Sequence, residues 1–239
     1  MSFIVNLLHT IFIYIFVVIT FIVGTMITTI VALFASNKQH VFQKAANIWA
    51  KIIIAVSRTK VKVEGIENIP ADQPLVLAAN HQSAADILIL LANIPLFFKF
   101  VIKRELFKVP IFGTYLRLAG YIPIDRFKTL KAHKTLYDTS KQIRRGETIL
   151  IFPEGTRTRD GSLGQFKRGS LVIAKQSGVP VLPIAISGSF DIMPRGTFII
   201  HPSKVKLTIG EPIPVNDKDM EKTIHKVRSK IESMLKESF

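Results

Sequence analysis

A histidine and an aspartate lie five residues apart in the segment 80–86 (Asn-His-Gln-Ser-Ala-Ala-Asp). The preceding residues, Leu75–Ala79, are all apolar, as expected for a buried strand that delivers His81 to its carboxyl end. From the first turn of a following helix, the Asp86 carboxylate can bond one ring nitrogen of His81, which leaves the other nitrogen free to accept a proton. This spacing therefore predicts a general base that removes a proton from a hydroxyl group.

The same residues also allow a purely structural interpretation. Ser83 is a favoured residue at a helix N-cap, and Asp86 would then be the third helical residue, where an acid bonds a free backbone N–H. The pattern His-x4-Asp is short enough to occur by chance. The sequence alone leaves this capping role open beside the catalytic one.

A second polar group follows the apolar run Thr148–Phe152, in the segment 153–157 (Pro-Glu-Gly-Thr-Arg). Gly155 allows a tight turn, and the Arg157 guanidinium can bind a phosphate through two parallel hydrogen bonds. The alternative is a polar loop with a solvated arginine. Glu154 and Thr156 lie in the same turn.

Lys103 and Arg126 come at the ends of two further apolar runs. Taken singly, each is an ordinary surface charge. If the runs are parallel strands, both cations reach the same edge of the sheet as His81 and Arg157. A general base beside a group of cations suggests a hydroxyl-bearing phosphate monoester as substrate.

These residues must be positioned by a sheet, because short β-rich runs alternate with helical stretches throughout residues 61–239. We therefore expect one α/β domain there, with a mostly parallel or mixed sheet of about seven strands flanked by helices. The expected strands are Val61–Glu64, Leu75–Ala79, Phe98–Lys103, Gly120–Ile124, Thr148–Phe152, Val181–Ile186 and Val205–Ile209. The expected helices are Asp86–Ala92, Thr129–Arg145, Gly169–Ser177 and about Asp217–Glu237.

Residues 1–60 have a different character and form a separate N-terminal membrane segment. The run Phe3–Ala35 is apolar and uncharged, and as one straight helix it would be about 50 Å long, more than a bilayer core requires. It either spans with tilt or breaks near Gly24. His40–Ser57 predicts a basic amphipathic helix at a membrane interface, although a helix packed on the domain core is the alternative.

The charges are unevenly distributed and indicate the side of the membrane. The chain has 32 Lys and Arg against 17 Asp and Glu, and six of these basic residues precede the first acid, Glu64. Basic residues beside an apolar span mark its cytoplasmic side and attract anionic lipid. We expect a lipid bilayer as partner and the second domain on its cytoplasmic face. The chain contains no cysteine, which excludes disulfides and a cysteine nucleophile.

The order of the motifs resembles the four sequence blocks of the glycerolipid acyltransferases, specifically the 1-acylglycerol-3-phosphate acyltransferases. The blocks are Asn-His-x4-Asp, Lys-x-Glu-Leu followed by Gly-x4-Asp-Arg, Phe-Pro-Glu-Gly-Thr-Arg, and the segment Val179–Pro183. The resemblance covers about residues 61–210, and it makes residues 61–239 an acyltransferase domain.

The resemblance implies a transfer to the 2-hydroxyl of lysophosphatidic acid, with acyl-CoA or acyl-carrier protein as donor. His81 is then the general base oriented by Asp86, and no metal or cofactor is implied. Acceptor phosphate binding falls to Lys103, Arg126, Glu154, Gly155, Thr156 and Arg157. The Val179–Pro183 block is associated with donor binding.

Three other hypotheses remain at this point. The same chemistry could act on glycerol-3-phosphate or another lysolipid. A basic membrane-surface protein without catalytic activity would conflict with the intact His81–Asp86 pair. A membrane-attached nucleic-acid binder is permitted by the charge of +15, but the chain has no recognition motif for nucleic acid.

Overall fold

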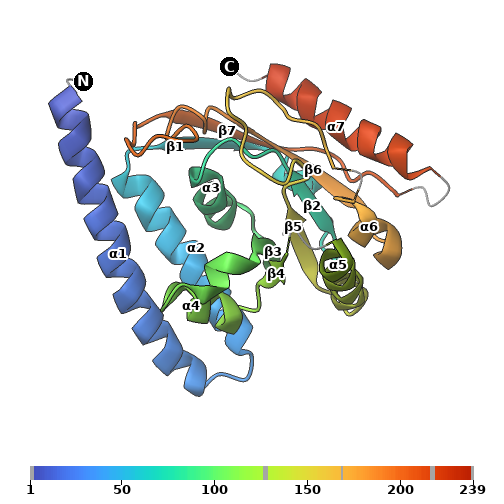
Figure 1. Cartoon of the computed structure of the whole chain (residues 1–239), viewed down its shortest axis with the longest axis horizontal. Coiled ribbons are helices and arrows are strands. Elements are labelled where there is room, and N and C mark those ends of the chain that lie inside the picture. Colours follow the sequence, from blue (N-terminus) through green and yellow to red (C-terminus); the bar gives the residue numbers. More distant parts are fainter. Residues whose placement is uncertain (1–2, 126–128, 168, 216–218, 238–239) are drawn as a thin grey trace.

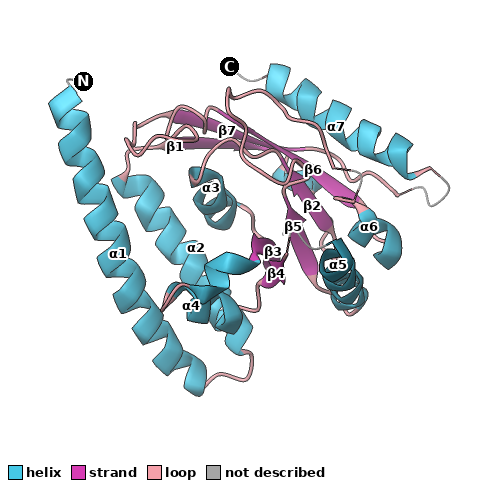
Figure 2. Ribbon diagram, in the orientation of Figure 1, coloured by secondary structure: helices cyan, strands magenta, loops and turns pink. Residues whose placement is uncertain are grey.

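A seven-stranded mixed sheet forms the middle layer of the protein and carries helices on both faces (Figures 1 and 2). The computed structural model describes residues 3–125, 129–167, 169–215 and 219–237. The strand order is β1-β7-β6-β2-β5-β3-β4, and only the β6–β7 pair is antiparallel. The strands are β1 (Lys60–Glu64), β2 (Val76–Ala79), β3 (Phe98–Lys103), β4 (Ile122–Ile124), β5 (Thr148–Ile151), β6 (Val181–Ser187) and β7 (Lys204–Ile209).

All seven strands fall where the sequence predicts them, so the α/β fold with a mixed seven-stranded sheet is confirmed. Strands β2, β3, β4, β5 and β6 run in the same direction. Their carboxyl ends therefore meet at one edge of the sheet, which is where sites form in such folds.

Alternate residues of the buried strands supply two separate cores. Leu75, Leu77 and Ala79 face the side covered by α2 (Lys38–Val56), α3 (Ala85–Asn93) and α4 (Phe112–Leu118). Val76 and Ala78 face the other side, which α5 (Thr129–Arg144), α6 (Val172–Ser177) and α7 (Met220–Lys236) cover. Two short 3-10 helices complete the described elements, at Ile66–Asn68 and Arg104–Lys108.

Helix α1 (Phe3–Leu33) is continuous through Gly24, so the alternative of a break there is wrong. It is the one helix of the described residues that is long and apolar enough to cross a membrane. Figure 1 shows it lying beside α2 along one side of the domain. Side-chain hydrogen bonds attach it at Thr10 to Ile200, at Tyr14 to Phe198, and at Thr20 to Trp49.

Helix α2 begins at Lys38, and its N-cap Asn37 accepts a hydrogen bond from the His40 N–H. The side with Phe42, Ala46 and Ala50 is buried against the domain. This side matches the alternative of a helix packed on the core. The opposite side stays exposed and carries Lys44, Ile48, Lys51 and Ile52.

Candidate active site

The His81–Asp86 pair forms at the carboxyl end of β2. His81 Nδ1 lies 2.7 Å from Asp86 Oδ2, and the His81 side chain is 15% exposed whereas that of Asp86 is fully buried. The same carboxylate oxygen also accepts hydrogen bonds from the backbone N–H groups of Gln82 and Ser83, at 2.7 and 2.9 Å. Asp86 therefore fixes both the ring and the turn that carries it. Nε2 has no protein hydrogen bond within the described residues.

The structure corrects the expected start of the helix after this turn. Helix α3 begins at Ala85 with Ala84 as N-cap, so Ser83 lies one residue outside the cap and Asp86 is the second helical residue. The Ser83 oxygen still accepts from the Ala85 N–H at the start of the helix, at 3.3 Å, and the hydroxyl also donates to the Met193 carbonyl, at 3.1 Å. The Asp86 carboxylate bonds the free backbone N–H of Ser83, so a capping contact and the contact with His81 coexist.

Two neighbouring segments hold the His81 backbone and ring. The Asn80 side chain makes two hydrogen bonds to the backbone of Ile186 on β6, at 2.7 and 2.9 Å. The His81 carbonyl accepts from the N–H of Thr158, at 2.9 Å. The imidazole stacks on Phe152, with ring centroids 4.0 Å apart and planes 15° from parallel. His81 is thus held by β6 and by the segment after β5, on the two sides of β2.

Glu154 uses its carboxylate to join this turn to the segment after β5. Oε1 accepts from the His81 N–H at 2.7 Å, and Oε2 accepts from the Gly164 N–H at 2.9 Å. The residue is buried, and this burial raises the pKa of Glu154, while its two backbone N–H donors act in the opposite direction.

The turn after β5 brings basic side chains together. Gly155 has φ +73°, a left-handed conformation that disfavours other residues, and a Cβ there would lie about 3 Å from the Lys167 side chain. Thr156 is exposed and Arg157 is half-buried. The Arg157 carbonyl accepts a hydrogen bond from the guanidinium of Arg195, at 3.1 Å.

The two other predicted cations differ in what can be said of them. Lys103 ends β3 at the same edge of the sheet as His81, and β5 separates β3 from β2. Its side chain is 45% exposed and lies 3.8 Å from the Glu105 carboxylate. Arg126 lies outside the described residues. Among the described residues, no group of three His, Asp or Glu side chains could hold a metal ion.

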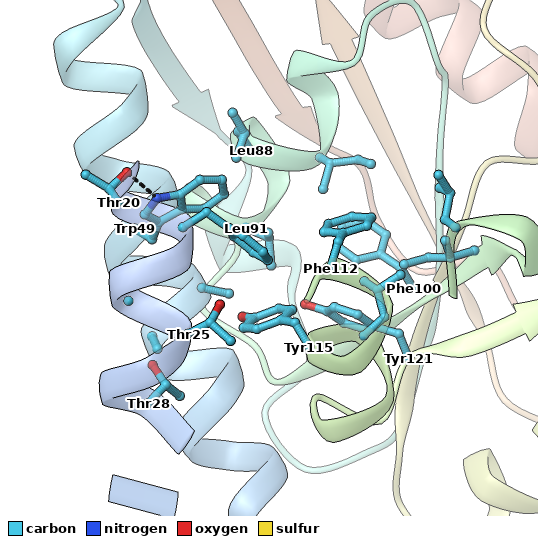
Figure 3. A pocket seen from close by; sticks show the side chains of 18 residues that line it. Thr20, Thr25, Thr28, Trp49, Leu88, Leu91, Phe100, Phe112, Tyr115 and Tyr121 are labelled. Carbon is cyan, nitrogen blue, oxygen red and sulfur yellow. Dashed lines mark hydrogen bonds between the residues drawn. The ribbon is translucent and has the colours of Figure 1, made fainter. Parts of the chain in front are cut away.

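An apolar cavity lies on the α3 side of the sheet, next to the rings that support His81. This first cavity encloses about 740 Å³, counting the part open to solvent. Figure 3 shows Trp49, Leu88, Phe100 and Tyr121 pointing into it, with α1 on one side. Phe100 also packs near Phe152, at a centroid distance of 6.4 Å. The cavity and the imidazole thus contact the same stack of rings.

The sequence profile of the family described as Acyltransferase matches residues 60–187, which is more than half of the chain. The chain belongs to this acyltransferase family. It is 36% identical over 220 residues to the chloroplastic 1-acyl-sn-glycerol-3-phosphate acyltransferase of Arabidopsis thaliana, an alignment that covers 90% of this chain and 61% of that protein. It is 37% identical over 167 residues to the 1-acyl-sn-glycerol-3-phosphate acyltransferase of Pseudomonas aeruginosa, covering 68% and 62%.

A solved structure agrees with the fold over the full length. The 1-acyl-sn-glycerophosphate acyltransferase PlsC of Thermotoga maritima superposes with a TM-score of 0.88 at 29% identity, covering 99% of this chain and 98% of that one. The chain spans about three-fifths of the length of the two curated relatives. The expected resemblance to this family is therefore confirmed.

Several residues of this candidate site were not predicted from the sequence. Asn80, Lys167 and Arg195 are common surface types, and only the structure places them beside the His81 turn or the Arg157 turn. Asn80 directly precedes His81, which is the one signal that could have found it. Arg195 lies in the long segment after β6, where nothing in the sequence relates it to Arg157.

Proposed function

We propose that this acyltransferase moves an acyl group from a thioester, acyl-CoA or acyl-carrier protein, to the 2-hydroxyl of 1-acylglycerol-3-phosphate, which gives phosphatidic acid. The observation that carries the proposal is the His81 Nδ1–Asp86 Oδ2 contact of 2.7 Å at the carboxyl end of β2. The names of the relatives in Arabidopsis and Pseudomonas support the choice of acceptor.

The His81–Asp86 geometry supports direct transfer without an acyl-enzyme. His81 Nε2 takes the proton of the acceptor hydroxyl, and the hydroxyl oxygen attacks the thioester carbonyl. The C–S bond then breaks, and the imidazolium returns its proton to the leaving thiolate. Asp86 keeps Nδ1 protonated and stabilises the imidazolium while it carries both protons.

The first cavity supports a fatty-acyl substrate. Its lining is almost entirely apolar, and it abuts Phe100, which packs near the Phe152 ring under His81. An acyl chain placed there would have its carbonyl end close to the imidazole.

The turn after β5 supports a phosphate-bearing acceptor. Arg157 directly precedes Thr158, whose N–H bonds the His81 carbonyl, and the Lys167 side chain lies beside Gly155 in the same turn. We assign Glu154 a different role from the phosphate contact that the resemblance implies. Its carboxylate already accepts two backbone hydrogen bonds and would repel a phosphate, so it positions the His81 turn.

The N-terminal helices support a location at the membrane. Helix α1 is attached to the domain at Thr10, Tyr14 and Thr20, so it lies along the domain and presents its outer apolar side to the bilayer. The exposed side of α2 adds Lys44 and Lys51, which favour anionic lipid. Binding through this side keeps the acyltransferase domain on one face of the membrane, which we take to be the cytoplasmic face.

The test is transfer by the purified protein in liposomes or detergent. Lysophosphatidic acid, glycerol-3-phosphate, lysophosphatidylcholine and monoacylglycerol are offered with acyl-CoA and with acyl-carrier protein. We expect the highest kcat/KM with lysophosphatidic acid, and activity that disappears in His81→Ala. A higher kcat/KM with any other acceptor, or no transfer at all, would overturn the proposal.

A further inference from the structure

A second apolar cavity lies beside the first, and Leu88 of α3 lines both. It encloses about 680 Å³, counting the part open to solvent, and it is lined by Val17 of α1, Ala84 and Ala85 at the start of α3, and Ile192 and Met193 after β6. None of the residues that line it is charged. The mechanism described above makes no use of this cavity, although one of the residues that line it, Ala84, comes only three residues after His81.

Leu88 lines both cavities, so this side chain of α3 lies between them. Helix α1 forms a wall of each, with Ile13, Tyr14 and Val17 at the second cavity and residues 20–28 at the first. The protein thus holds two apolar compartments side by side under one helix. The proposed reaction also involves two acyl chains, one on the donor and one already on the acceptor.

The segment that lines the second cavity also carries a cation. We call residues 188–203, between β6 and β7, the β6–β7 loop. Ile192 and Met193 of this loop line the cavity, and Arg195 follows two residues later and donates to the Arg157 carbonyl at 3.1 Å. Within the described residues neither Arg157 nor Arg195 has a carboxylate partner. The Arg195 guanidinium is thus held at the backbone of Arg157, so two arginines without a carboxylate partner in the described residues belong to the same corner of the site, which favours an anion there.

The order of these groups matches the order of groups in a lysophosphatidate. The cavity lining includes Ala84, three residues after His81, and the His81 carbonyl accepts a hydrogen bond from the N–H of Thr158, the neighbour of Arg157. In 1-acylglycerol-3-phosphate the acyl chain, the free hydroxyl and the phosphate follow each other on successive carbons. A chain in the second cavity and a phosphate at Arg157 and Arg195 would leave the hydroxyl at the base.

We infer that the second cavity is the site of the chain that the acceptor already carries, and that Arg195 is a further ligand of the acceptor phosphate. The inference rests on the proposed function. The first cavity, which abuts Phe100 near the ring that stacks on His81, is left for the acyl chain of the donor. The enzyme then selects the two chains independently, on opposite sides of Leu88.

The test compares three variants of α1. Val17→Phe adds bulk in the second cavity, whereas Val18→Phe adds the same bulk at a position 54% exposed on the same helix. Gly24→Leu adds bulk in the first cavity, where an added Cβ meets no atom within 4 Å. Rates are measured with lysophosphatidic acids of 6 to 18 carbons and, separately, with acyl-CoA donors of the same lengths; thermal unfolding reports whether each variant is folded.

We expect Val17→Phe to lower kcat/KM for long-chain acceptors relative to short ones by about tenfold or more, the loss expected when several buried methylenes are excluded. Its donor preference should stay as in the wild type. Gly24→Leu should lower kcat/KM for long-chain donors relative to short ones and leave the acceptor preference as in the wild type. Val18→Phe should change neither preference. An unchanged acceptor preference in folded Val17→Phe, or a shifted donor preference, would overturn the inference.

A labelling experiment gives an answer that does not depend on a variant folding. Wild-type protein in liposomes is irradiated with a lysophosphatidic acid that carries a diazirine at the end of its chain. Adducts should map to residues 13–17 and 192–200, and labelling confined to residues 20–28 would contradict the inference. Wild-type turnover of lysophosphatidic acid, measured first, shows whether the proposed function itself holds.

Arg195 is tested separately with the variant Arg195→Gln. The control variant is Arg159→Gln, at an exposed arginine two residues after Arg157. Loss of a charge-assisted contact should raise KM for lysophosphatidic acid about tenfold in Arg195→Gln. The KM for monoacylglycerol, which lacks the phosphate, should change little in the same variant. Equal effects on both acceptors would show that Arg195 only supports the loop.

Discussion

At the scale of single residues, the imidazole of His81 is held by more contacts than a solvent-exposed base would need. The Asp86 carboxylate bonds the ring nitrogen Nδ1, the Glu154 carboxylate accepts from the backbone N–H of His81, and the Phe152 ring stacks on one face of the imidazole. These contacts come from α3 and from the segment after β5. The sequence predicted the His81–Asp86 contact because five residues at a strand-to-helix turn bring the two side chains together. It could not predict Glu154 as a support, because that contact joins positions 73 residues apart.

Removal of His81, the proposed base, should reduce transfer severely without unfolding the protein. His81 is 15% exposed and makes its ring contacts at the edge of the sheet, so His81→Ala removes little of the core. We expect kcat to fall by about a hundredfold to ten-thousandfold, the usual contribution of a general base. Steady-state kinetics and circular dichroism measure the two effects, and substantial turnover in a folded variant would contradict the assignment.

The replacement Asp86→Asn separates catalysis from capping. An amide oxygen can still accept the N–H bonds of Gln82 and Ser83, but it cannot stabilise an imidazolium. We expect kcat to fall by a factor of about a hundred or more, with a smaller effect on unfolding. If the variant loses thermal stability and keeps its rate, the carboxylate serves the turn alone.

The raised pKa of Glu154 leads us to expect that the stability of the fold depends on pH. Burial raises the pKa of Glu154 in the folded protein above its ordinary value of 4.5. A group with a raised pKa contributes stability that is complete below its unfolded pKa and is lost as the pH rises through the folded one. The Tm of the wild type minus that of Glu154→Gln should therefore decrease from about pH 4 to about pH 8. A difference that stays constant, or grows, would show that the two backbone hydrogen bonds outweigh burial.

At the scale of elements, the strands were predictable and the helix boundaries less so. Each strand is a short apolar run, and buried parallel strands need little else. Helix α4 was not predicted, because its seven residues, Phe112–Leu118, are too few to show a helical period. The start of α3 lies one residue later than predicted; the Ser83 oxygen still accepts from the Ala85 N–H, but its hydroxyl also donates to Met193, a partner 110 positions away. Local capping rules carry no information on such a contact.

Asn80 provides a test of how β2 is held beside β6. Both of its hydrogen bonds are buried, and they continue the strand pairing past the last paired residue, Ala79. Asn80→Ala leaves the Ile186 N–H and carbonyl without these partners, which costs about 2–4 kcal/mol. That cost corresponds to a Tm lower by roughly 5–15 °C for a chain of this size.

The matched control is Asn93→Ala, which removes a single hydrogen bond within α3, from the Asn93 side chain to Ile89. We expect a much smaller decrease in Tm there, and no effect on kcat. Differential scanning fluorimetry and the transfer assay measure both. Similar decreases in Tm in the two variants would show that the two Asn80 hydrogen bonds have no special part in holding β2 beside β6.

At the scale of the whole molecule, the sequence predicted a membrane segment followed by one α/β domain, and the structure adds how they are joined. Helix α1 contacts the β6–β7 loop through Thr10 and Tyr14, and it contacts helix α2 through Thr20. It also forms walls of both cavities. This arrangement could not be predicted, because an apolar helix has the same composition whether it lies on a domain or crosses a bilayer.

The outer side of α1 should therefore carry the membrane contact. Ile15 and Ile19 are 55% and 56% exposed and lie one turn apart, on the side that does not face the domain. Two glutamates at these positions would have to be placed against lipid, so Ile15→Glu with Ile19→Glu should lower co-sedimentation with anionic liposomes at least severalfold. The Tm in detergent should change little, since neither side chain packs on the domain.

The control for this pair is Tyr137→Glu, on α5 at the opposite face of the sheet, where a 49% exposed ring is replaced by the same acid. It should leave co-sedimentation unchanged. Lys44→Gln with Lys51→Gln should remove mainly the part of binding that salt weakens, because those side chains act through charge. If the variant with both glutamates on α1 co-sediments like the wild type, the bilayer contacts another surface. The proposed membrane contact through the outer side of α1 would then be wrong.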